Sequence, residues 1–205
     1  MSAPDRILRV KIQLDDWRPV IWRRVDVPAT ASLKALHDLI QAVMPFEGYH
    51  LFEFRADDRR YAIPDPEWDS FGTKTVSAKS IRIGSLVERG ISQLAYTYDF
   101  GDDWRFTIMV EADQEADPTL EYPRFLDGEG RAPPEDVGGL SGFETFLEAM
   151  ADPQHEEHED VRRWYGGPFD PADIGHAEIL KRVDKLARRR VLGKAGFAKS
   201  RGLIQ

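Results

Sequence analysis

Three carboxylates crowd a single short turn at residues 96–104, which read Tyr-Thr-Tyr-Asp-Phe-Gly-Asp-Asp-Trp. Asp99, Asp102 and Asp103 offer hard oxygen ligands of the kind that Mg²⁺ and Ca²⁺ take in proteins. Their spacing does not match the calcium-binding loop, in which acidic residues alternate and a glutamate closes the loop. Aspartate also favours turns, because its side chain bonds nearby backbone N–H groups. We therefore expect these carboxylates to shape the turn, and a metal-dependent role stays open as the alternative.

Two further acids, Glu135 and Asp136, lie in a segment rich in glycine and proline. If residues 122–139 fold back onto the turn, these acids would line a cleft with its aromatic rings, which is the arrangement expected of an active site. Paired acids would also suit a basic partner, or would simply bond the backbone amides of the segment. The candidate surface site comprises Tyr98, Asp99, Asp102, Asp103, Trp104, Glu135 and Asp136.

No complete catalytic motif occurs in the sequence. His155 and His158 are three residues apart, whereas the zinc-protease motif needs two histidines four apart on one helix face. Ser141 is displaced from the position of a nucleophile elbow, and with Glu144 it forms the pattern of a helix capping box. With no cysteine there is no thiol nucleophile and no thiolate metal site. We predict no catalytic residue, no cofactor and no bound metal.

Charge is distributed unevenly along the chain. Residues 181–205 carry nine Lys or Arg against one acid, a charge of +8, whereas the first 180 residues carry −16. An acidic body repels nucleic acid, but a basic tail can contact phosphate. The candidates for such a contact are Lys185, Arg188, Arg189 and Arg190. The favoured alternative is a solvated helix end or a tail lying on the acidic body, with residues 191–205 flexible.

The periodicity of apolar residues predicts the elements that position these side chains. A period of two predicts strands at 7–14, 20–27, 50–56, 60–63, 94–98 and 104–110. The last two strands form a hairpin whose turn is at 99–103, with Gly101 able to take a positive φ. Helical spacing predicts a helix between Ser32 and Pro45 and a short helix at 83–88. His37, in the first helix, is expected at its surface or edge.

This order of elements indicates an α+β fold with a mixed sheet of five or six strands and one helix packed on it, as in a β-grasp or an α/β roll. A helical C-terminal part follows, in which Asp170 is expected to cap the last helix. We predict a single domain over residues 1–190. It comprises a sheet and helix core at 1–112, an irregular Gly/Pro-rich loop at 113–140, and C-terminal helices at 141–190.

Composition restricts the class of protein. Hydrophobic residues make up 41% of the chain and aromatic residues 11%, which excludes wholesale disorder. The N-terminus lacks the apolar run of a signal peptide, and no stretch approaches the ~18 apolar residues of a membrane span. The absence of cysteine fits a reducing compartment. We expect a cytoplasmic protein that does not contact a membrane.

Several motifs spread along the chain together resemble the plasmid pRiA4b ORF-3-like family. The resemblance begins with the turn at 96–104 and continues through most of the remaining sequence. The further matching segments are Tyr122-Pro123, Asp127-Gly128-Glu129, residues 133–139, Gly142-Phe143, Asp152-Pro153, His155, Trp164, Gly167 and Phe169-Asp170-Pro171.

The resemblance implies a single α+β domain with a helical C-terminal part. Relatives occur on plasmids and beside insertion sequences, and many have cysteines where this chain has Phe125 and Ala132. Without those cysteines, we expect no metal or redox role for this loop. The resemblance transfers no catalytic residues. Our leading hypothesis is a non-enzymatic binding or accessory module associated with mobile genetic elements, with a protein as a possible partner. The alternatives are a metal-dependent hydrolase or nuclease at the acidic turn, and nucleic-acid binding through the basic tail.

Overall fold

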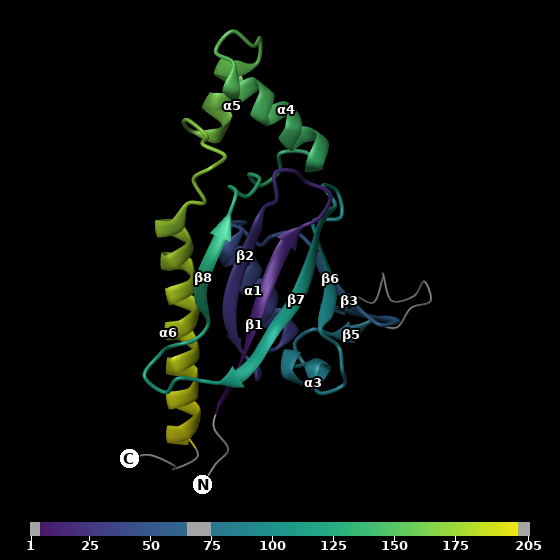
Figure 1. Ribbon diagram of the computed structural model, residues 1–205, viewed down its shortest axis with the longest axis vertical. Coiled ribbons are helices and arrows are strands. Elements are labelled where there is room, and N and C mark those ends of the chain that lie inside the picture. The colour runs from purple at the N-terminus through teal and green to yellow at the C-terminus, as the bar shows by residue number, and fades with distance from the viewer. Residues whose placement is uncertain (1–4, 65–74, 201–205) are drawn as a thin grey trace.

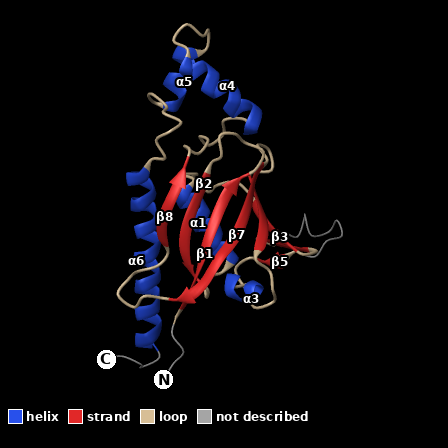
Figure 2. Cartoon of the chain, in the orientation of Figure 1, coloured by secondary structure: helices blue, strands red, loops and turns tan. Residues whose placement is uncertain are grey.

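The computed structural model describes residues 5–64 and 75–200 and contains an eight-stranded mixed sheet (Figures 1 and 2). Neighbouring strands are antiparallel except β4 and β5, which are parallel. The order across the sheet is β5 (Val76–Ser77), β4 (Arg59–Ala62), β3 (Phe52–Ala56), β6 (Gln93–Tyr98), β7 (Trp104–Glu115), β1 (Arg6–Leu14), β2 (Trp22–Pro28) and β8 (Arg124–Glu129). The predicted α+β class is confirmed, but the sheet is wider than the five or six strands expected.

The central strands follow the predicted alternation. In β1, Leu8, Val10 and Ile12 are fully buried, and the residues between them point to the other face. The predicted hairpin of β6 and β7 is confirmed, with Tyr96 opposite Phe106 and Tyr98 opposite Trp104. All four rings are buried, as expected for apolar side chains that share one face of a pleated strand pair. The aromatic residues of the hairpin therefore hold the sheet to its core.

Helix α1 (Leu33–Val43) packs on the inner face of the sheet, where Ser32 caps it by accepting a hydrogen bond from the Ala35 N–H. Beyond the sheet, α4 (Gly139–Ala151) and α5 (His158–Tyr165) project from one end, and α3 (Ile83–Val87) lies near the other (Figure 1). Helix α6 (His176–Ser200) runs beside β8 and contacts α1. Within residues 5–64 and 75–200, no helix combines the length and the apolar character that a membrane crossing needs.

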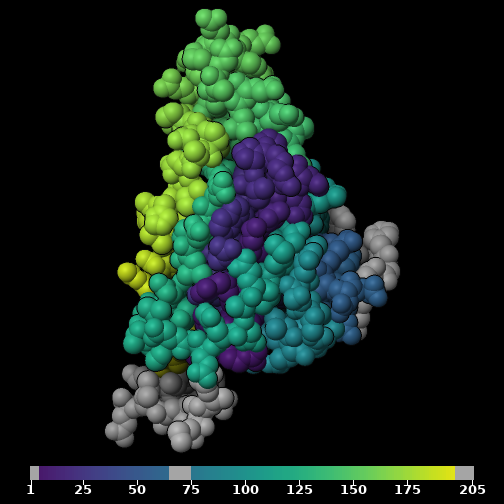
Figure 3. Space-filling model, in the orientation of Figure 1, coloured from purple at the N-terminus to yellow at the C-terminus, as the bar shows by residue number. Residues whose placement is uncertain are grey.

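The outer face of the sheet carries a network of charged side chains. Arg9 pairs with Asp26 at 3.0 Å, and Arg24 pairs with Glu111 at 2.7 Å across neighbouring strands. Arg24 also lies over the ring of Trp22. Figure 3 shows atoms of β1 and β7 reaching the surface on this face, with no helix drawn over them. The sheet thus buries one face under α1 and keeps the other polar, as antiparallel sheets commonly do.

The prediction of an irregular loop over residues 113–140 was wrong. Strand β7 continues to Glu115, and β8 adds an edge strand that pairs with β2 and buries Phe125. Glycines and prolines concealed this strand, whose pairing partner lies about a hundred residues earlier in the chain. Residues 191–200 are likewise helical rather than a flexible tail, and Lys194 in this last part of α6 bonds Asp5 at 2.5 Å.

Three local expectations also differ from the structure. Helix α4 begins at Gly139 with Gly138 as its N-cap, at a φ of 94°, so Ser141 lies inside the helix. Asp170 caps a turn by accepting a hydrogen bond from the Ala172 N–H, and α6 starts later. His37 is only 3% exposed, because α1 turns it towards the sheet and stacks it on Phe52.

A glycine at the start of α4 is expected to be required for stability. A Cβ on Gly142 would collide with the Val137 carbonyl oxygen, so Gly142→Ala should lower the free energy of unfolding by about 1–3 kcal/mol. Gly193→Ala is the matched control, since a Cβ there meets nothing within 4 Å and alanine favours a helix by about 0.5–1 kcal/mol. Urea unfolding followed by circular dichroism measures both changes. Equal stability of the two variants would contradict this close packing.

A carboxylate cluster around His50

The hairpin turn is shaped by its aspartates. Asp99 and Asp103 adopt positive φ values of 54° and 55°, which Asp tolerates better than most residues. The Gly101 N–H donates to Asp99 Oδ1 at 2.9 Å, and Arg105 Nε donates to Asp103 Oδ1 at 3.0 Å. Sequence reasoning placed the positive φ at Gly101, but the structure places it on the flanking aspartates, whose side chains bond the turn. The turn-shaping role expected for these carboxylates accounts for Asp103 fully and for one oxygen of Asp99.

The segment after β8 folds back onto this turn. The Gly138 N–H donates to Asp102 Oδ2 at 3.1 Å, and the Tyr98 hydroxyl donates to Glu135 Oε1 at 2.9 Å. Trp104, in contrast, is 1% exposed and packs against Phe46 in the core. It therefore does not belong to a surface site, because its place on the inner face of β7 turns its ring away from solvent.

The side chain that joins the acids is His50, which lies in the loop before β3. Its Nε2 donates to Asp136 Oδ1 at 2.8 Å. The same nitrogen lies 3.5 Å from Asp99 Oδ2 and 3.7 Å from Glu135 Oε1. We call these four residues, His50, Asp99, Glu135 and Asp136, the His50 cluster. Three carboxylates from two distant segments thus face one imidazole nitrogen.

Each carboxylate of the His50 cluster is held by its other oxygen. Asp99 uses Oδ1 for the turn amide described above, and Asp136 Oδ2 accepts a hydrogen bond from the Tyr49 hydroxyl at 2.6 Å. Glu135 Oε2 accepts from the Glu47 N–H, also at 2.6 Å. Every acid therefore has one oxygen anchored to the surrounding structure and one oxygen directed at His50.

The charges of the cluster shift the pKa of its members. Burial lowers the pKa of His50, but the hydrogen bond to Asp136 and the nearby carboxylates outweigh it, so the net shift is upward. Burial raises the pKa of Glu135, an effect that the Glu47 N–H and the Tyr98 hydroxyl only partly offset. Hydrogen bonds from Tyr49 and His50 lower the pKa of Asp136. The cluster therefore has an excess of negative charge over the single imidazole.

A cavity of about 280 Å³ adjoins the cluster, and its lining includes His37, His50 and Phe52. A family model described as plasmid pRiA4b ORF-3-like protein matches residues 6–178. This chain belongs to that family. The match includes the hairpin, the segment that folds onto it and every residue of the His50 cluster.

Two relatives of this pRiA4b ORF-3-like chain are similar over most of its length. Uncharacterized protein y4hQ of Sinorhizobium fredii (strain NBRC 101917 / NGR234) is 40% identical over 185 residues, which cover 89% of this chain and 93% of that protein. The crystal structure of the protein of unknown function MM3350 from Methanosarcina mazei Go1 has a TM-score of 0.75 and 33% identity. The match covers 83% of this chain and 96% of that one. Neither name states a function, so a function for this family member depends on the chemistry of its site.

Sequence reasoning did not find His50 or Tyr49 in this family member. It assigned His50 to a strand beside apolar residues, but β3 begins at Phe52 and leaves His50 in the preceding loop. No spacing signal links His50 to Asp136, because the two residues are 86 positions apart. Only the fold brings the imidazole to the acids.

The four basic residues predicted to contact nucleic acid lie on α6. Lys185 and Arg188 are exposed, whereas Arg190 is half-buried and donates to the Thr30 hydroxyl at 3.3 Å. Arg189 lies next to Arg190 along a groove between α6 and α1. The four residues therefore do not form one surface.

Proposed function

We propose that this protein is a non-enzymatic binding module and that the His50 cluster is its site for a divalent cation. The observation that carries the proposal is the direction of the carboxylates. Three acids each have one oxygen anchored by a neighbour and the other turned to a common centre, as expected of ligands that surrounding groups orient for a metal.

The separations within the cluster fit a single ion. Ligand atoms of His50, Asp99 and Asp136 all lie within 4.8 Å of one another. Two ligands on opposite sides of one ion are separated by twice the bond length, about 4–5 Å for bonds of about 2.0–2.6 Å. An ion would displace the Nε2 proton that His50 now donates to Asp136. The Tyr49 hydroxyl and the Glu47 N–H would then support the ligating acids from outside.

The mixture of ligands indicates which cations fit best. Mg²⁺ and Ca²⁺ take oxygen ligands, whereas imidazole suits later transition metals and zinc. One imidazole with two or three carboxylates is therefore best matched to Zn²⁺ or Mn²⁺. A cation would also offset the excess negative charge, in particular that of Glu135, whose pKa burial raises.

We expect Zn²⁺ or Mn²⁺ to bind the full-length protein saturably with a one-to-one stoichiometry. Isothermal titration calorimetry of protein treated with a chelator measures the affinity, and Mg²⁺ is the comparison cation, expected to bind more weakly. A rise in the melting temperature with cation concentration gives an independent readout, since a ligand that binds only the folded state stabilises it. Absence of binding at millimolar concentrations of all three cations would contradict the proposed function.

A metal-dependent hydrolase or nuclease is the second candidate, and the cavity beside His50 favours it because it offers space for a substrate group. Incubation of the zinc- or manganese-loaded protein with plasmid DNA and with a phosphodiester ester separates the candidates. Cleavage that is lost in His50→Ala would support the hydrolase, and cation binding without turnover supports the binding module. A role of such a module in the cytoplasm, beside mobile genetic elements, is consistent with the plasmid origin of the family's name.

A further inference from the structure

We propose that a second site, the groove between α6 and the start of α1, binds the phosphate groups of a nucleotide-sized ligand. We call it the basic groove; its rim comprises Lys79, Arg82, Arg189 and Arg190, and its floor includes Val27 and Leu186. This site is separate from the His50 cluster, with which it shares no residue. The two proposals therefore stand or fall independently.

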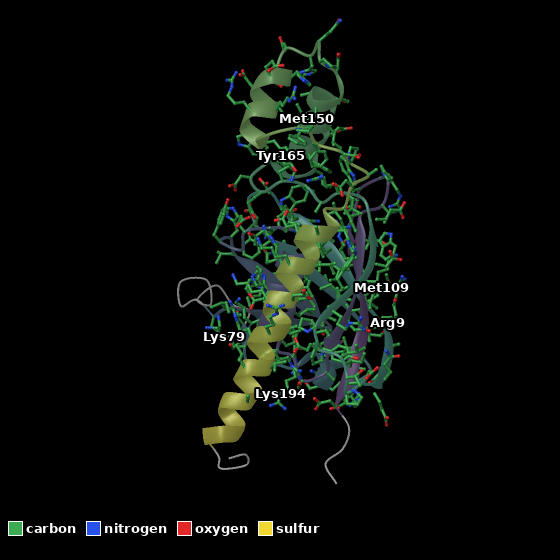
Figure 4. All side chains as sticks on the ribbon, turned by 90° about the vertical axis from the view of Figure 1, so that its left-hand side faces the viewer. Arg9, Lys79, Met109, Met150, Tyr165 and Lys194 are labelled. Atoms are coloured by element: carbon green, nitrogen blue, oxygen red, sulfur yellow. The ribbon has the colours of Figure 1, made fainter. Side chains whose placement is uncertain are left out.

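Four cations from two distant segments converge on the basic groove. Lys79 and Arg82 come from the segment between β5 and α3, whereas Arg189 and Arg190 come from α6, about a hundred residues later. Figure 4 looks along this side of the molecule and shows Lys79 beside α6. Convergence of like charges is unfavourable in the free protein, so the groove presents a positive field that an anion would relieve.

These cations are not neutralised by neighbouring acids. Among the described residues, no carboxylate forms an ion pair with Lys79, Arg82 or Arg189. The acids closest to the groove are already engaged, since Asp38 bonds Lys34 and Asp5 bonds Lys194.

Arg190 is the innermost of the four cations. Its guanidinium is half-buried and bonds a neutral hydroxyl, that of Thr30, rather than an acid. Burial lowers its pKa, although the charge of Asp5 acts in the opposite direction. A desolvated guanidinium favours an anionic partner, and a phosphate can accept two parallel hydrogen bonds from it.

The main chain of α1 does not provide the site. The first three amides of the helix already donate to Ile81 O, Ala78 O and Ser32 Oγ. An anion in the basic groove must therefore be held by side chains, with the positive end of the helix dipole adding a weaker attraction. Substitutions of those side chains consequently test the site directly.

The size and lining of the groove indicate the class of ligand. Its volume is about 470 Å³, within the range of small-molecule sites, and an apolar floor lies beneath the charged rim. Val27 is buried in the core and Leu186 is half-buried, so both are fixed by packing. A phosphate group would sit at the rim and an apolar or aromatic body, such as a nucleobase, would cover the floor.

The test compares two double variants of the full-length protein. Lys79→Ala/Arg189→Ala removes two exposed rim cations, and Lys185→Ala/Arg188→Ala removes two exposed cations of α6 outside the groove. Calorimetry with ADP, pyrophosphate and a short single-stranded DNA measures binding. We expect the rim variant to weaken binding at least about tenfold and the control to change it less than about twofold, because each charge-assisted hydrogen bond contributes about 1.5–3 kcal/mol.

The outcomes separate the sources of phosphate. Tighter binding of ADP than of DNA, lost in the rim variant, identifies a free nucleotide; the reverse order with the same loss identifies the phosphates of a strand. Equal weakening in both double variants would show general attraction to a basic helix and would overturn the groove. Absence of binding of all three probes at millimolar concentration would overturn it as well. Unchanged melting temperatures of both variants confirm that folding is not affected.

Discussion

Asp136→Asn is expected to weaken Zn²⁺ or Mn²⁺ binding by at least about 100-fold, the upper end of what loss of an outer-shell partner costs. Asparagine keeps the size of the side chain but removes the charge that lies 2.8 Å from His50 Nε2. It also offers only one oxygen, and that oxygen is shared with the Tyr49 hydroxyl, which now bonds Oδ2. Calorimetric titration of the variant against the wild-type protein measures the loss.

Asp103→Asn is the matched control for this variant. Asp103 belongs to the same acidic turn, but its carboxylate bonds Arg105 rather than facing His50. We expect its cation affinity to stay within about twofold of the wild type, because exposed ion pairs contribute little. If Asp136→Asn binds as tightly as Asp103→Asn, cations are held by general acidic charge and the His50 cluster is not the site.

Local patterns predicted the strands that form the centre of the sheet. The alternation in β1 and in the hairpin of β6 and β7 is set by side chains that point in turn to the core and to solvent. The Ser32 cap and the stop near Pro45 bounded α1 for equally local reasons. These features depend on neighbours a few residues apart, so one sequence contains the information.

Features that depend on distant pairing were not predictable in the same way. Strand β8 exists because the edge of β2 accepts it, and its glycine at position 128 fits only because Arg23 lies against it. The acids of the candidate site were found from their density, but the position of His50 among them follows from the fold. The sequence therefore identified half of the cluster's chemistry, and tertiary structure supplied the imidazole.

His37 is expected to make the protein sensitive to mild acid. Burial, with a smaller contribution from the charge of Lys34, lowers the pKa of His37 to about 3. In the unfolded chain a histidine has a pKa of about 6.5, so below that pH the unfolded state binds the proton that the folded state rejects. The free energy of unfolding therefore falls as the pH decreases from about 6.5 towards 3. At pH 5 the loss from this residue amounts to about 2 kcal/mol.

The structure explains why the folded state rejects that proton. The imidazole is stacked on Phe52 with ring centroids 3.8 Å apart, and a hydrogen bond of 2.8 Å joins its Nδ1 to the Tyr96 hydroxyl. No carboxylate of the described residues forms an ion pair with it. A charge at this position would be buried without an acid to balance it.

Comparison of pH slopes isolates the contribution of His37. His37→Gln should lose less stability than the wild type between pH 7 and pH 5, by about 2 kcal/mol, whatever its stability at pH 7. Urea unfolding in the presence of a chelator measures the slope without a contribution from bound cations. His50 acts in the opposite direction, because its raised pKa adds stability as the pH falls, and both proteins retain it. The exposed His155 provides the control, since His155→Gln should leave the wild-type slope unchanged. A wild-type slope in His37→Gln would mean that this histidine takes up its proton in the folded state.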